Sequence, residues 1–398
     1  MTTGAAGDRN DSGARVGAWL IGARGSVATT TIAGAGAVAA GLAPETGIVT
    51  AAQQFDGAGL VDIGDIVFGG HDIVETPLAL RAARLVDAGV LPPGIPDAVR
   101  ERIADAESEL RSGIGWHEAR TEPRSAVERA AVELREFRSR HDLDRVVVLN
   151  LSSTEPPVDQ HSAHSDSDSL LEAVDRGLAI LPPSSLYALA AIETGSAFVD
   201  FTPSTGARLP ALVGLAESAG VPIAGSDGKT GETFMKAVLA PGFASRSLRV
   251  RSWAGTNLLG GGDGESLADP SRAESKLASK GRVVEQILGY PVEAPVRIDR
   301  VRDLGEWKTA WDHITFEGFL GVRMRLQFTW EGCDSALAAP LLLDLTRLAG
   351  LALERGQTGV VSELAYFFKD PAGTEQHSLH RQFEVLRQWI TEGIEVTP

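Results

Sequence analysis

The chain has 398 residues, of which 43% are hydrophobic, and it carries a formal net charge of −16. This length allows two domains, and the acidic balance argues against nucleic acid or an anionic membrane surface as the main partner, because both need basic patches. The single cysteine, Cys333, excludes an intrachain disulfide, and the lack of a signal peptide or a long uninterrupted apolar run predicts a cytoplasmic protein with no membrane partner.

The N-terminal part of the chain has the pattern of a nucleotide-binding unit. Residues 1–14 are polar and glycine-rich and are predicted to form a disordered tail. A buried strand is expected at 16–21, followed by a glycine loop at 22–28 and a helix rich in small residues. This order is typical of dinucleotide-binding domains. The candidate cofactor contacts in the loop are Gly22, Arg24, Gly25, Ser26 and Val27.

The loop is imperfect as a fingerprint, since Arg24 stands where glycine normally lets the backbone approach a pyrophosphate. Arg24 either pairs with a phosphate or belongs to a structural turn in a nucleotide-free domain. Further strands are predicted at 46–52 and 65–72. Because ligands bind at strand ends in doubly wound sheets, Asp56 and Asp72 are competing ribose contacts, although the spacing from the glycine loop fits neither well.

The pattern is helical from residue 77 to residue 141 and then changes to a buried strand at 145–150. This strand opens into a hydroxyl-rich loop, in which Ser152 and Ser153 are candidate cofactor contacts. The next segment contains histidines and aspartates that suggest a metal site, but a solvated loop is preferred because nothing fixes their geometry. These residues are His161, His164, Asp166 and Asp168.

Strands and helices continue to alternate up to residue 225. Helices are predicted at 182–195 and 209–220, and strands at 198–201 and 221–224. The alternation predicts an α/β fold with a mostly parallel, doubly wound sheet. Thr202 and Pro203 follow one of the strands and are further candidate cofactor contacts.

The stretch from Gly225 to Lys280 concentrates the features of an anion-handling site. A glycine-rich turn leads into a helix that begins near Thr230, and free N–H groups at such a helix start favour an anion. Lys229, Thr230 and Gly231 are therefore candidate phosphate ligands, and a plain capped turn is the alternative.

Lys276 and Lys280 are four residues apart, so they would share one helix face and repel each other unless an anion lies between them. The alternative for these two lysines is a solvated helix face.

The pattern changes after Pro241 to period-two strands, predicted at 248–253, 296–299, 313–316 and 322–328. These strands indicate a second, α+β domain with an antiparallel sheet that has one exposed face. Such sheets often pair subunits, so we expect an oligomer. The predicted limits are 15–228 for the first domain, 229–333 for the second, and 334–398 for C-terminal helices that return to the first domain.

Lys369 follows three aromatic residues, where partial dehydration would lower its pKa. A snorkelling surface lysine is the alternative.

Several segments, in order along the chain, resemble the myo-inositol-1-phosphate synthase family, and the resemblance covers nearly the whole chain after the tail. They read GSDGKTGETFMKAVLAPGF, GTNLLGGGDG, SKLASK, LGEWKTAWDHITFEGFLG, CDSALAAPLLLDL and AYFFKDP. The resemblance implies a Rossmann-type NAD-binding domain and an α+β domain for catalysis and oligomerisation, commonly in a homotetramer. It also implies conversion of D-glucose 6-phosphate to 1D-myo-inositol 3-phosphate by oxidation, enolisation, aldol cyclisation and re-reduction, with no net use of NAD.

The resemblance also implies the site residues. The family's acidic and lysine positions fall on Asp227, Asp263, Lys276, Lys280, Lys308, Asp334 and Lys369. Asp227 is in addition a cofactor contact, and the family's GGxD loop favours Asp72 for that role. Lys276 and Lys369 would act as acid, base and oxyanion partners around C5 and C1, Lys308 would contact a C1 or C5 oxygen, and Lys280 the phosphate.

The acidic residues would orient lysines or hold a monovalent or divalent cation. The chain departs from the family at Gly261 and Gly262, which precede Asp263 where the family usually has asparagine. Two other functions remain as alternatives. A dehydrogenase of the semialdehyde or homoserine type would produce net NADH, and a degenerate NAD-binding regulator would have no activity.

Overall fold

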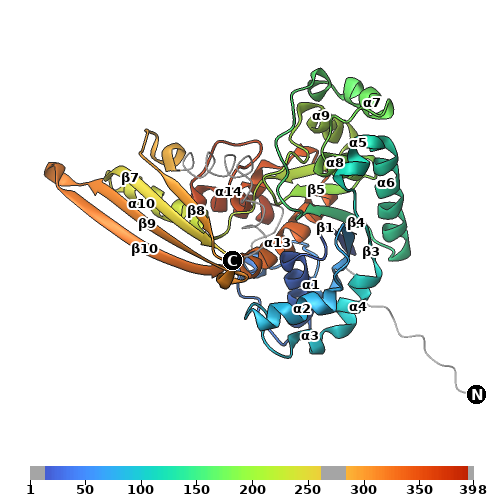
Figure 1. The fold of residues 1–398 in the computed structure, drawn as a ribbon, viewed down its shortest axis with the longest axis horizontal. Helices are drawn as coiled ribbons and strands as arrows, with labels where there is room; N and C mark the ends of the chain where they lie inside the picture. Colours follow the sequence, from blue (N-terminus) through green and yellow to red (C-terminus); the bar gives the residue numbers. More distant parts are fainter. Residues whose placement is uncertain (1–13, 261–283, 393–398) are drawn as a thin grey trace, which may run out of the picture.

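The computed structural model describes residues 14–260 and 284–392. Figure 1 shows a parallel sheet covered by helices on both faces and a second, longer sheet that extends away from it. The strands of the first sheet are β1 (Val16–Ile21), β2 (Val67–Asp72), β3 (Leu110–Ser112), β4 (Arg145–Asn150), β5 (Ala197–Asp200), β6 (Pro222–Gly225) and β11 (Gly359–Val360). The Rossmann-type architecture expected from the alternating pattern is confirmed.

The order of the first sheet places a ligand-binding crevice between β1 and β4. The strands lie in the order β11-β6-β5-β4-β1-β2-β3, and all neighbouring pairs are parallel. The chain first builds outward from β1 to β3 and then returns to the other side of β1 for β4, so the direction of winding reverses between these two strands. In open α/β sheets ligands bind at this switch point, beyond the carboxyl ends of the strands.

Helices bury both faces of the first sheet. Successive side chains of β1 point in opposite directions, and Leu20 belongs to one apolar cluster while Trp19 belongs to the other. Both faces are apolar because both are covered, which explains the continuous hydrophobic runs of the strands. One face packs on α1 (Ser26–Ala39), α2 (Leu78–Asp87), α4 (Arg100–Ser108), α13 (Asp334–Glu354) and α14 (Leu379–Thr391), and the other on α5 (Trp116–Thr121), α6 (Pro123–Arg140), α7 (Ser167–Asp175), α8 (Pro183–Glu193) and α9 (Pro210–Ala219).

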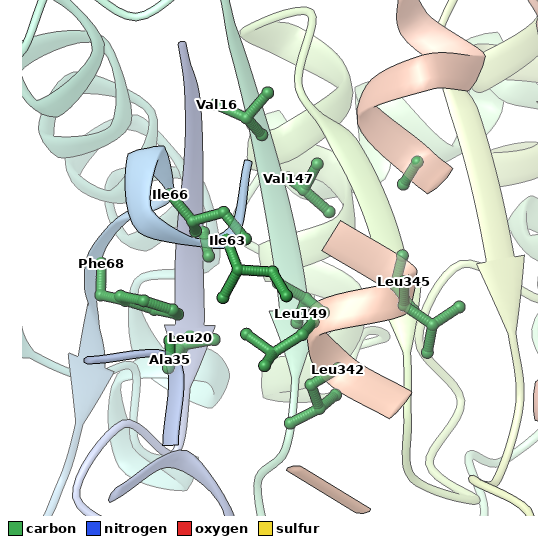
Figure 2. Packing of buried hydrophobic residues seen from close by; sticks show 14 of the residues in the cluster. Val16, Leu20, Ala35, Ile63, Ile66, Phe68, Val147, Leu149, Leu342 and Leu345 are labelled. Atoms are coloured by element: carbon green, nitrogen blue, oxygen red, sulfur yellow. The ribbon is translucent and has the colours of Figure 1, made fainter. Parts of the chain in front are cut away.

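Figure 2 shows the first of these clusters, in which Leu149 and Val147 of β4 lie near Leu342 and Leu345 of α13. Among the described helices, α13 is the one long and apolar enough to cross a membrane, but 67% of its most apolar window is buried inside the protein. Its apolar surface is therefore already used in the fold. A short helix, α3 (Ile95–Ala98), lies between α2 and α4.

The second sheet is mixed, so the predicted antiparallel arrangement is wrong for one strand. Its strands, β7 (Arg249–Leu259), β8 (Val296–Arg300), β9 (Trp307–Glu317) and β10 (Arg323–Cys333), lie in the order β10-β9-β7-β8. β8 pairs with β7 in parallel, and the other two pairs are antiparallel. The chain between β7 and β8 is long enough for the crossover that a parallel pair requires. α10 (Gly231–Ser245) packs Phe243 on Trp253 and Ile314 of this sheet.

Three local predictions need correction. Residues 46–52 do not form a strand but contain a 3-10 turn, Val49–Ala51, because the buried carboxylate of Asp344 accepts the backbone N–H groups of Val49 and Thr50 at 2.9 and 2.8 Å. The helical stretch 77–141 is interrupted by β3, which pairs with β2. The predicted solvated loop at 158–169 is partly helical.

In that last segment, Asp166 accepts the backbone N–H of Ser169 at 2.8 Å and caps α7. Its role is structural, as expected for an aspartate at a helix start.

Candidate active site

The glycine loop after β1 forms the floor of the crevice. Gly22 has φ +87°, and a Cβ there would lie 3.1 Å from the backbone of Leu151 and Ser152, so only glycine lets the loops after β1 and β4 approach this closely. Gly25 precedes α1 and makes no side-chain cap bond. The first N–H groups of α1 therefore face the crevice as donors for an anion such as a pyrophosphate.

Two hollows of about 270 and 250 Å³ adjoin each other along this loop. Both are lined by Gly22, Gly25, Leu151, Ser152 and Ser153, so together they form one elongated crevice across the carboxyl ends of β1 and β4. This shape and position fit a dinucleotide. The predicted contacts Ser26 and Val27 line the second hollow.

Asp72 lies in the first hollow, at the end of β2. Its carboxylate accepts the backbone N–H groups of Arg24 at 2.7 Å and Val74 at 2.9 Å, so it fixes the glycine loop while its remaining lone pairs face the hollow. Asp56, its competitor, is exposed and lines neither hollow. The guanidinium of Arg24 pairs with Glu107 and donates to the carbonyl of Thr76 at 3.1 Å, so it is already engaged by protein groups.

His71 and Tyr187 also line the first hollow, and the sequence had not singled them out. The Trp19 indole N–H donates to His71 Nδ1 at 2.9 Å, so the ring proton is on Nε2, which faces Glu133 Oε2 at 2.5 Å. Burial lowers the pKa of His71, although Glu133 acts in the opposite direction. A neutral histidine that stacks on Tyr187, with ring centroids 5.2 Å apart, makes a rigid wall.

At the other end of the crevice, two ion pairs join four elements. Lys369 Nζ lies 2.8 Å from Asp227 Oδ1, and Lys308 of β9 pairs with Asp334, the first residue of α13. Lys308 and Asp334 line the second hollow. Lys369 is brought there by backbone pairing, because its N–H donates to the carbonyl of Asp227 at 2.7 Å, and Gly228 pairs with Phe368.

The two pairs belong to one cluster. Burial acts to raise the pKa of Asp334, but the charges of Lys308 and Lys369, together with hydrogen bonds from Lys308 and Thr230, outweigh it and lower that pKa. Both ammonium groups are thus close enough to act on one carboxylate. A Cβ at Gly231 would lie 2.6 Å from Lys308 Nζ, so the first turn of α10 adjoins the same cluster.

Lys229 does not share this arrangement. Its ammonium donates to Gln382 Oε1 of α14 at 2.6 Å, and burial lowers its pKa to about 7. It lines a separate hollow of about 250 Å³ with apolar walls, together with Phe234, Trp330 and Tyr366.

Of the remaining candidates, Thr202 is buried behind the crevice, and Pro203 lines a different hollow near His161 and His164. Asp263, Lys276 and Lys280, with Gly261 and Gly262, lie outside the described residues. Within 14–260 and 284–392, no group of three or more His, Cys, Asp or Glu residues is arranged to hold a metal ion. The cation therefore stays a prediction.

One sequence signal for the site went unused. The chain has six lysines, and all of them fall between residues 229 and 369. Arginine provides the positive charge in the rest of the sequence. Since lysine changes its protonation state more readily than arginine, its restriction to this stretch marks the part of the chain that carries the chemistry.

Comparisons with known proteins agree with this architecture. An NAD-binding family model, described as myo-inositol-1-phosphate synthase, matches residues 16–391. The chain is 33% identical to inositol-3-phosphate synthase 1 of Bacteroides thetaiotaomicron, over 96% of each chain. It is 31% identical to inositol-3-phosphate synthase isozyme 1 of Arabidopsis thaliana, over 85% of this chain and 67% of the relative.

Two solved structures share the fold. Inositol-3-phosphate synthase of Caenorhabditis elegans superposes with a TM-score of 0.84 at 23% identity, covering 95% of this chain and 85% of that one. A myo-inositol-1-phosphate synthase-related protein of Thermotoga maritima gives 0.76 at 25% identity, covering 94% and 98%. Because the family model spans nearly all of the described residues, the chain belongs to the myo-inositol-1-phosphate synthase family.

Proposed function

We propose that this protein converts D-glucose 6-phosphate to 1D-myo-inositol 3-phosphate. The observation that carries the proposal is the junction of a dinucleotide-shaped crevice with a cluster of two lysines and two aspartates. The relatives named above carry the name of this activity. NAD, when bound in the crevice, would take a hydride from C5 of the open-chain sugar and return it at the end of the reaction.

The lysine cluster suits the steps between these hydride transfers. A ketone at C5 acidifies the C6 protons, and removal of one gives an enolate whose C6 attacks the C1 aldehyde. Each of these steps places negative charge on oxygen. Fixed ammonium groups stabilise such charge by about 3–4 kcal/mol per well-placed donor. We assign Lys308 to a C1 or C5 oxygen, and Lys369 with Lys276 to acid, base and oxyanion roles.

Asp227 and Asp334 would keep the lysines oriented. Each accepts from one lysine in the structure, and a carboxylate partner favours the charged ammonium. A monovalent or divalent cation held by Asp263 with one of these aspartates is part of the same proposal. Its test is turnover after exhaustive chelation, followed by separate addition of K⁺ and Mg²⁺.

The substrate phosphate is assigned to the start of α10. Gly231 adjoins Lys308, and a helix N-terminus favours an anion, whereas the N–H of Thr230 already donates to the carbonyl of Gly228 at 3.1 Å. Lys280 would add a direct charge. Lys229 stays a candidate phosphate ligand, but its Nζ donates to Gln382 in the structure and burial lowers its pKa to about 7, so it would contribute little fixed charge at neutral pH.

We further propose a cytoplasmic homotetramer. The face of the second sheet opposite α10 presents Trp311 with 42% of its surface exposed, which suits contact with another subunit. Light scattering on the purified protein tests the assembly, and cell fractionation tests the location.

One incubation decides the main proposal. The protein is mixed with glucose 6-phosphate and NAD, and inositol phosphate and NADH are measured together. Inositol phosphate without accumulation of NADH supports the synthase. NADH alone would indicate a dehydrogenase, and neither product would indicate a regulator.

A further inference from the structure

Asp200 is a buried carboxyl behind the crevice that the reaction itself does not use. It ends β5 and is 2% exposed. Its Oδ1 accepts three hydrogen bonds, from Thr202 N at 3.0 Å, Thr202 Oγ1 at 2.9 Å and Asn150 Nδ2 at 3.1 Å. Among the described residues its Oδ2 has no partner. Gly206 closes over that oxygen, since a Cβ there would lie 2.1 Å from Oδ2.

The first connection from Asp200 leads to the cofactor loop. Asn150, at the end of β4, donates to Asp200 and accepts from Ser152 through its side-chain oxygen, at 2.7 Å from Oγ and 3.3 Å from N. Ser152 lines both hollows of the crevice. Asp200 thus fixes the orientation of the Asn150 amide, and that amide fixes the turn that faces the cofactor.

The second connection leads to the lysine cluster. Thr202, held by Asp200 through both its N–H and its hydroxyl, accepts the N–H of Asp227 at 3.1 Å on its carbonyl. The neighbouring carbonyl of Phe201 accepts the N–H of Gly228 at 3.0 Å. The Asp227 carboxylate then binds Lys369. The loop that Asp200 organises is therefore the support for one of the two catalytic ion pairs.

We propose that Asp200 is a positioning residue that holds the cofactor loop at Ser152 and the Asp227–Lys369 pair in fixed relation to each other. This inference rests on the proposed function for its catalytic half. A buried acceptor with three donors suits the role, because its loss leaves the N–H and hydroxyl of Thr202 without this acceptor and leaves Asn150 Nδ2 with Thr202 Oγ1 alone, at 3.2 Å. Burial raises the pKa of Asp200 to about 7. A neutral side chain of the same shape should therefore substitute for it.

The test compares Asp200→Ala, Asp200→Asn and the control Ser185→Ala. Ser185 is equally buried and donates to the carbonyl of Gly206 in the same loop region at 2.7 Å, but it has no bond to Asn150 or Thr202. Three quantities are measured, namely NAD affinity, hydrogen exchange at the amides of Ser152 and Asp227, and turnover at saturating NAD and substrate.

For Asp200→Ala we expect NAD affinity and turnover each to fall about tenfold or more, and both amides to exchange about ten times faster. Asp200→Asn should stay within about threefold of the wild type in all three, because it keeps the Oδ1 acceptor. Ser185→Ala should match the wild type. The proposal is overturned if Asp200→Ala behaves like Ser185→Ala, or if only one of the two amides responds.

If Asp200→Ala does not fold, Thr202→Val replaces it, since it removes the hydroxyl that donates to Asp200 and accepts from Asn150 Nδ2 and Ser204 N, each at 3.2 Å. It should accelerate exchange at both amides by about threefold, and unchanged exchange at either would overturn the proposal. NAD affinity and exchange need no substrate. A wild-type protein that makes no inositol phosphate would therefore refute the proposed function without deciding this test.

Discussion

The two ends of the crevice are held by different kinds of interaction. At the cofactor end, hydrogen bonds fix the backbone of the loops, as in the contacts of Ser152 with Asn150 and of the Asp72 carboxylate with the N–H of Arg24. At the catalytic end, ion pairs join residues far apart in the sequence, such as Lys369 and Asp227. These bonds would set the shape of the backbone that receives the cofactor, whereas the paired charges would act in catalysis. Single substitutions should therefore change either NAD affinity or turnover, but not both to the same extent.

Removal of a lysine from the catalytic end should have the largest effect. Lys369→Ala is expected to lower turnover about 100- to 1,000-fold, because one donor to the developing oxyanion is lost, while NAD affinity stays unchanged. Steady-state kinetics and NAD titration measure the two quantities. Asp370→Ala is the control, since the neighbouring Asp370 pairs with Arg208 outside the cluster. Normal turnover of Lys369→Ala would contradict the assignment of catalysis to the charged end of the crevice.

Asp72 tests the cofactor end. Asp72→Ala should weaken NAD binding about 10- to 100-fold, because two loop N–H groups lose their acceptor and the ribose loses its proposed partner. Turnover at saturating NAD should change much less. Asp56→Ala, which removes an exposed aspartate outside the crevice, should bind NAD normally. If Asp72→Ala and Asp56→Ala lost the same amount of NAD affinity, the role assigned to Asp72 would be wrong.

Glu306 lies where the two ends meet, and its substitution should act in the opposite direction. Its carboxylate accepts from Ser26 Oγ at 3.0 Å, at the start of α1, where a pyrophosphate is expected. Glu306→Gln should tighten NAD binding by about two- to fivefold at low salt, and added salt should reduce the gain. Glu331→Gln, on the exposed side of β10, provides the matched loss of one charge. Weaker binding by Glu306→Gln would contradict a repulsive role.

The last prediction concerns stability rather than activity. The pKa of Lys229 is about 7 in the fold, against 10.5 for an ordinary lysine, so between these values the unfolded chain binds a proton that the native chain lacks. This difference makes native stability rise with pH across that window, by at most about 1.4 kcal/mol per pH unit. Lys229→Met should lack this slope. Urea unfolding of both proteins from pH 7 to pH 10 measures it, and parallel curves would exclude it.

Much of the fold followed from local patterns. Five strands of the first sheet, β1, β2, β4, β5 and β6, were predictable because they form buried apolar runs such as 145–150 between helical stretches, whereas the short strands β3 and β11 were missed. Residues 46–52 have a similar composition but lack a strand, because Asp344, far along the chain, takes their backbone N–H groups. The parallel direction of β8 could not be predicted from the sequence for a similar reason. Strand pairing depends on the path of a long connection, which composition does not encode.

The site was predictable to a different degree at its two ends. The glycine loop and the hydroxyl loop after β4 indicated the cofactor end directly, because a local pattern creates it. Family resemblance pointed to the four charged residues of the catalytic end, and the structure shows that Lys308 pairs with Asp334 and Lys369 with Asp227. The type of a residue does not show which residue far away in the sequence it will contact in the fold. His71 and Asp200 were missed because each acts through partners on other elements.

The pairing of residues 226–229 with 367–370 has a consequence for how the molecule forms. These two segments close a loop that contains the whole second sheet, so the contact between Lys369 and Asp227 is among the last that a growing chain can make. Long loops close slowly and at an entropic cost. Because β11, α13 and α14, which complete the first sheet and cover one of its faces, also follow the second sheet along the chain, a nascent chain completes its nucleotide-binding scaffold and its catalytic charges together, after the second sheet has been synthesised.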